Sequence, residues 1–120
     1  MVTSGDIFLQ IFVLCTFARQ SEAMGYKTFV IDGNALTDWK AFHKVFKDTL
    51  AFPDYYGNNM DAWIEAMVDI KESLLISITD SEKLKEDAEE IYFTILECSA
   101  LVNSIKIDEG DETVIAVSLD

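Results

Sequence analysis

The chain has 120 residues and a mass of 13.5 kDa, a size that fits one compact domain better than two. Half of the residues are apolar, so the chain can bury a core and is not a disordered tail. The 9 Lys and Arg against 22 Asp and Glu give a formal net charge of −13, which argues against unassisted binding to nucleic acid or to an anionic membrane because phosphate is repelled.

Histidine and cysteine are too few for the usual structural metal site. One His and two Cys, Cys15 and Cys98, do not supply the four ligands of a structural zinc site. The five glycines are scattered and form no phosphate-binding loop. We therefore expect no metal and no cofactor, and two free thiols, which favours a reducing compartment.

Residues 7–18 form an almost uninterrupted apolar run, IFLQIFVLCTFA. Twelve residues are too few to cross a bilayer as a helix, and the preceding residues lack the Lys or Arg of a signal peptide. Three interpretations stay open: a dispensable extension upstream of a natural start at Met24, a packing helix or strand, and a signal sequence. We divide the chain into an apolar extension, residues 1–23, and a domain, residues 24–120.

Three short apolar runs in the domain predict β-strands: residues 27–31 (KTFVI), 74–78 (LLISI) and 113–119 (TVIAVSL). Between them, apolar residues recur at three- and four-residue spacing, which predicts helices. The element order is β-α-α-β-α-β. Helical connections between apolar strands predict an α/β fold with a small parallel sheet packed with helices.

The predicted helices have recognisable starts and stops. Thr37 can cap the first, which Pro53 ends, and Asn58 or Asn59 can cap the second, which runs to about residue 71. A third helical stretch begins near residue 80 and frays near residues 103–104. We expect a turn at residues 108–112 (DEGDE), exposed to solvent rather than binding calcium, because the spaced ligands of a calcium loop are missing.

The second helix is acidic on its outer face. Residues 61–120 carry four Lys against sixteen acids. The spacing of four acids places them on one side of this helix: Asp61, Glu65, Asp69 and Glu72. Such a face is usually only solvated. On the inner side, Trp63 belongs to the predicted core, and His43 on the first helix is expected to be a surface or boundary residue without a catalytic partner.

Residues 52–67 read FPDYYGNNMDAWIEAM, an aromatic loop that runs directly into a helix N-terminus. The pattern Tyr-Tyr-Gly-x-Asn-x-Asp-Ala, after a proline and within this element order, resembles the barstar family of intracellular inhibitors of a secreted bacterial ribonuclease. The similarity extends more weakly from about residue 27 to residue 119. It implies the barstar-like fold, with a three-stranded sheet, and a protein that performs no catalysis.

The resemblance also implies partner-binding residues. Asp61 and Glu65 match the two central acids of the family, although the second is Asp there, so that Glu65 is one methylene longer. The other implied contact residues include Ile64, where the family has a Trp, and an acid on the last helix. They are Tyr55, Gly57, Asn59, Ile64 and Glu97.

The function implied is inhibition by occupation. The partner would be a basic extracellular-type ribonuclease, bound in the cytoplasm by a protein that is monomeric when free. Carboxylates four residues apart on a helix can stand where RNA phosphates bind. The alternatives are an immunity or nucleic-acid-mimic protein for another basic toxin or nuclease, a carboxylate-based hydrolase using Asp61 and Glu65, and a stable domain with no such partner.

Overall fold

The computed structural model describes residues 26–120. Strands β1 (Lys27–Asp32), β2 (Leu74–Thr79) and β3 (Ile115–Leu119) form one sheet in the order β1-β2-β3. Both strand pairs are parallel, with Ile31 opposite Ile78 and Ile76 opposite Val117. The predicted three-stranded parallel sheet and the order β-α-α-β-α-β are confirmed. The apolar run at residues 7–18 and Cys15 lie outside the described residues.

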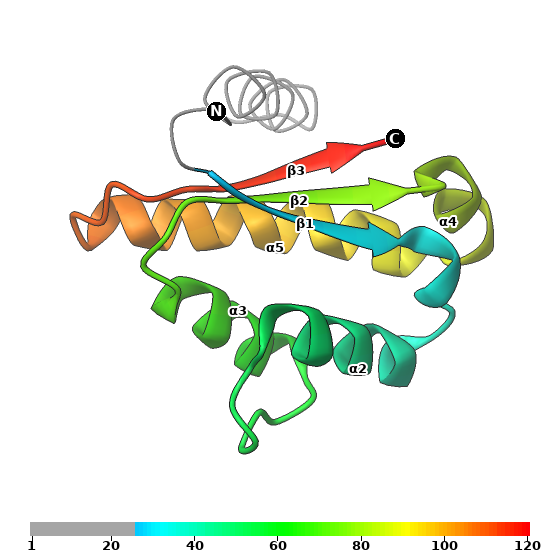
Figure 1. The fold of residues 1–120 in the computed structure, drawn as a ribbon, viewed down its shortest axis with the longest axis horizontal. Helices are drawn as coiled ribbons and strands as arrows, with labels where there is room; N and C mark the ends of the chain where they lie inside the picture. The colour runs from blue at the N-terminus through cyan, green and yellow to red at the C-terminus, as the bar shows by residue number, and fades with distance from the viewer. Residues whose placement is uncertain (1–25) are drawn as a thin grey trace.

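The helices lie mainly on one side of this sheet (Figure 1). They are α2 (Trp39–Leu50), α3 (Met60–Asp69), α4 (Ser81–Asp87) and α5 (Glu89–Asp108), with a short 3-10 turn, η2 (Gly33–Ala35), after β1. Leu74, Ile76 and Ile78 of β2 belong to the same buried cluster as the inner faces of the helices. Every second residue of the strand is expected there, because side chains of a strand alternate between its two faces. None of the helices in residues 26–120 is long and apolar enough to cross a membrane.

The core beneath α3 is largely aromatic. Trp63 is fully buried, as predicted, and its ring centroid lies 5.6 Å from that of Phe46 and 6.3 Å from that of Phe42. Phe42 and Phe46 are also fully buried on α2. This packing joins α3 firmly to α2 and fixes which face of α3 is turned to solvent.

Three details differ from the sequence prediction. Asp38, not Thr37, caps α2, because its carboxylate accepts the Ala41 N–H at 2.8 Å. The predicted third helix is two helices, since Ala88 leaves the helical conformation at φ −143°. The second of them, α5, continues to Asp108 and leaves Leu101 exposed. Two acids, Glu89 and Glu90, occupy its first turn, where they favour a new helix N-terminus.

Candidate protein-binding surface

The loop before α3 is held by its own backbone and by two buried aromatic rings. The Phe52 N–H donates to the Lys47 carbonyl at 3.0 Å, and the Tyr56 N–H donates to the Pro53 carbonyl at 2.9 Å. The rings of Phe52 and Tyr56 are buried and lie 4.9 Å apart between centroids. Tyr55, between them in sequence, is 82% exposed. The loop therefore buries one tyrosine and presents the other to solvent.

Tyr56 is anchored by His43. The Tyr56 hydroxyl and His43 Nδ1 share a buried hydrogen bond of 2.5 Å, so the expected surface or boundary position of His43 is wrong: only 4% of this residue is exposed. Burial lowers the pKa of His43 and raises the pKa of Tyr56 to about 12, because each charged form would lose its hydration. Both side chains are thus held neutral at pH 7.

Asn59 joins the loop to α3. Its side-chain oxygen accepts the Ala62 N–H at 2.8 Å, which makes Asn59 the cap of α3, and its Nδ2 donates to the Gly57 carbonyl at 3.3 Å. A Cβ at position 57 would lie 3.3 Å from that Nδ2. Gly57 therefore allows the close approach that lets Asn59 bridge the loop and the helix. Asn58 precedes the cap in the left-handed region, at φ 54°.

The acidic face of α3 is exposed, as predicted, but it holds three acids rather than four, because α3 ends at Asp69 and Glu72 lies beyond it. Asp61 and Glu65 are exposed one helical turn apart, and Asp69 follows one turn later. Ile64 is half-buried beside them, whereas Trp63 and Met67 are buried on the opposite side. Because the buried side chains fix the rotation of the helix, the carboxylates lie on the solvent side of α3, and Ile64 lies at the boundary, partly packed against the core.

Glu97 reaches this surface from α5. Burial first, then the charges of Glu97 and Asp61, raise the pKa of the Cys98 thiol, so both carboxylates act on the same half-buried group. Glu97 itself is exposed. Six of the seven predicted contact residues lie on the loop and α3, and the seventh, Glu97, lies on α5, which packs against α3.

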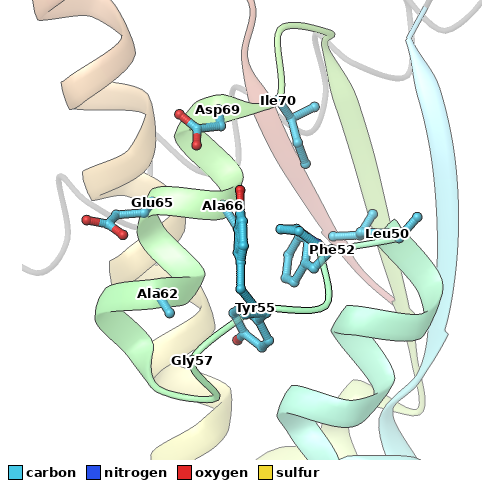
Figure 2. A pocket seen from close by; sticks show the side chains of 12 residues that line it. Leu50, Phe52, Tyr55, Gly57, Ala62, Glu65, Ala66, Asp69 and Ile70 are labelled. Atoms are coloured by element: carbon cyan, nitrogen blue, oxygen red, sulfur yellow. The ribbon is translucent and has the colours of Figure 1, made fainter.

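A cavity of about 300 Å³ separates the loop from α3. Figure 2 shows Tyr55 and Gly57 at one end, Asp69 and Ile70 at the other, and the carboxylates of Glu65 and Asp69 on the side of α3 that faces away from Phe52. Apolar side chains make up much of the lining: Leu50, Phe52, Ala62, Ala66 and Ile70. Asp69 also lines this cavity; it is not among the predicted contact residues, although its four-residue spacing from Glu65 places it on the same helix face.

The far end of α3 is fixed by a buried lysine. Lys106 is fully buried, and its Nζ donates to the Ile70 carbonyl at 2.6 Å, to Thr113 Oγ1 at 2.9 Å and to Asp111 Oδ2 at 3.2 Å. Hydrogen bonds from the Thr113 backbone and hydroxyl, with help from Lys106, hold the pKa of Asp111 well below its usual range. The predicted turn at residues 108–112 is present, but Asp111 is turned inward rather than solvated.

Within residues 26–120, no group of three or more His, Cys, Asp or Glu side chains could hold a metal ion. Cys98 is a free thiol. The surface made by the loop, α3 and Glu97 therefore consists of carboxylates, one exposed aromatic ring and small apolar patches, which suits contact with a basic protein.

Comparison with known proteins identifies the family. The family model described as barstar, the barnase inhibitor, matches residues 26–118. The chain belongs to the barstar family. That match includes β1, β2, every helix of the described structure and all of β3 except its last residue, so the family assignment does not depend on the loop alone. Proteins of the barstar family are inhibitors rather than enzymes.

A curated relative carries a related name. The chain is 44% identical over 36 residues to the protein named "Putative ribonuclease inhibitor YrdF" from Bacillus subtilis (strain 168). The matched segment covers 30% of this chain and 40% of that relative.

Proposed function

We propose that this barstar-family protein inhibits a basic ribonuclease by covering its active site with α3 and the preceding loop. The observation that carries the proposal is the placement of Asp61 and Glu65. They are exposed one turn apart on a helix whose two ends are fixed, by the Asn59 cap and by Lys106 at the Ile70 carbonyl.

The chemistry required is mimicry of RNA. A ribonuclease active site holds phosphates with cationic side chains, so an occluding protein needs carboxylates at a comparable spacing. Side chains at i and i+4 on a helix lie about 6 Å apart. Asp61 and Glu65 would accept charge-assisted hydrogen bonds from Arg or Lys of the enzyme, and exposed Glu97 on α5 would add a further ion pair.

Apolar contacts would complete the interface. Tyr55 is an exposed aromatic ring that can pack on the partner at a small cost in side-chain entropy. Gly57 and Asn59 shape the loop beneath it, and half-buried Ile64 lies beside Glu65 on α3. The partner would be an extracellular-type ribonuclease met in the cytoplasm of the producing cell, and the free inhibitor would be a monomer.

A titration of the full chain into a panel of secreted bacterial ribonucleases that includes barnase tests this proposal. RNA cleavage is followed in moderate salt with the wild-type chain and with Asp61→Asn, Glu65→Gln and Glu72→Gln. Glu72 is exposed beyond the end of α3, so E72Q is a control with the same change in charge.

The expected result is stoichiometric loss of cleavage that D61N and E65Q weaken by about ten-fold or more and that E72Q leaves nearly unchanged. If no enzyme of the panel is inhibited, ribonuclease is the wrong partner. Equal weakening by all three variants would indicate a general charge effect, as expected for a nonspecific binder of basic proteins.

A further inference from the structure

The sheet has a second face, opposite to the side on which the described helices lie (Figure 1). We call it the back face. Its central side chains alternate along each strand with those of the core, and none of them is charged, although 26% of the whole chain is. They are Thr28 and Val30 of β1, Leu75 and Ser77 of β2, and Ala116 and Ser118 of β3. An uncharged face is typical of a covered sheet, because parallel sheets are normally buried on both sides.

Two apolar residues of the back face are nearly inaccessible to solvent. Leu75 and Ala116 lie opposite each other in the sheet and are 4% and 1% exposed. Tyr26 packs against this pair, and burial raises the pKa of its hydroxyl. Val30, on the neighbouring edge strand, is instead 65% exposed. The back face therefore carries a small apolar cluster, separate from the main core, beside an apolar side chain that faces solvent.

We propose that the back face is the docking site of residues 7–18 of the same chain. Ten of these twelve residues are apolar and none is charged, so their transfer from water onto an apolar surface is favourable. The lengths also agree. Twelve residues wound as a helix would span about 18 Å, and strands of five or six residues span about 17–20 Å.

The connection to β1 supports this occupant. Tyr26, directly before β1, already packs on the back face. Residues 19–25 join it to the apolar run, and seven extended residues can reach about 25 Å, which is more than the length of a strand. A tethered segment has an effective concentration on the order of millimolar. Residues 7–18 are therefore favoured over a second copy of the chain as the cover of this face.

A cross-linking experiment on the full chain tests the docking. In a Cys98→Ser background Cys15 is the single thiol, and a second is added by Val30→Cys on the back face or by Ile107→Cys on α5. Val30 and Ile107 are 65% and 67% exposed, so the two positions are matched in accessibility. Unlabelled and ¹⁵N-labelled chains are mixed, treated with a short bismaleimide and analysed by mass spectrometry.

The expected product is a cross-link from Cys15 to position 30 within one chain, with far less cross-linking to position 107. Products of mixed isotope content would show that a second copy occupies the back face. Equal cross-linking of both positions, or none to position 30, would show that residues 7–18 do not dock there. Each of these outcomes overturns the proposal.

A second measurement avoids the cysteine variants. Phe12→Asp places a charge within the apolar run, and Ser4→Asp places the same charge before it. We expect F12D to shift the methyl resonances of Val30 and Leu75 in NMR spectra of the full chain, and S4D to leave them nearly unchanged. Identical spectra at these methyls in both variants would contradict the docking. The inference does not depend on the partner of α3, because F12D should retain any ribonuclease inhibition that the wild-type chain shows.

Discussion

Nδ1 of His43 on α2 lies 2.5 Å from the hydroxyl oxygen of Tyr56 in the loop, and both residues are buried. The contact spans thirteen residues of sequence. It joins α2 to the segment that carries the exposed Tyr55, so the shape of the candidate surface depends on this buried pair of side chains.

The first prediction concerns pH. Burial lowers the native pKa of His43 below its ordinary value of 6.5, so between the two pKa values the unfolded chain binds a proton that the native chain does not. The contribution of neutral His43 to the free energy of unfolding is therefore complete above about pH 6.5. It is lost as the pH falls toward the native pKa. Urea unfolding between pH 5 and 7 should show a shallower pH dependence in His43→Gln than in wild type. Parallel curves for the two proteins would contradict this.

The two adjacent tyrosines offer a matched comparison. Tyr56→Phe removes the hydroxyl that bonds His43 inside the core and should lower the free energy of unfolding by about 1 kcal/mol. Tyr55→Phe removes the same atom from a ring that is 82% exposed and should change stability by less than about 0.5 kcal/mol. Denaturant unfolding at pH 7 measures both, and equal effects would mean that the buried hydrogen bond contributes little.

A third prediction concerns the start of α3. Asn59→Ala removes the side-chain acceptor of the Ala62 N–H and should cost about 1 kcal/mol of unfolding free energy. Asn59→Asp keeps an acceptor at this position and should retain most of the stability. Thermal unfolding compares the three proteins. A stable N59A variant would show that packing alone fixes the first turn of α3.

The fourth prediction concerns the buried Lys106. Lys106→Met leaves the Ile70 carbonyl and the Asp111 carboxylate without their buried donor and should lower the unfolding free energy by about 3 kcal/mol. Lys71→Met is the control, because Lys71 also pairs with Asp111 but is largely exposed, and exposed pairs contribute little. Urea unfolding of both variants measures the two losses in free energy of unfolding. The prediction is wrong if K71M is as destabilised as K106M.

The fifth concerns the rate of binding to an inhibited ribonuclease. Residues 61–120 carry most of the net charge of −13, and such a field accelerates the encounter with a basic enzyme. Stopped-flow measurements should show an association rate constant that falls steeply with added salt, while the dissociation rate constant changes far less. An association rate that is independent of salt would show that the charge has no role in the encounter.

The strands and the acidic face of α3 could be predicted because their signals are local. Alternation and continuous apolar runs mark strands such as Leu74–Thr79, and helical spacing places Asp61 and Glu65 together. His43 and Lys106 could not be interpreted in this way. Their partners, Tyr56 and the Ile70 carbonyl, lie thirteen and thirty-six residues away, and only the folded chain brings them into contact. The break at Ala88 likewise carries no proline or glycine to announce it.

Two hydrogen bonds hold the loop that carries Tyr55 in the free protein. One joins Tyr56 to His43, and the other joins Asn59 to Ala62. A segment already held in one conformation loses little backbone entropy when it is covered. Complex formation should therefore proceed almost as a rigid docking step, with nearly superimposable free and bound backbones in residues 52–59. Affinity would then depend mainly on which side chains the loop and α3 display.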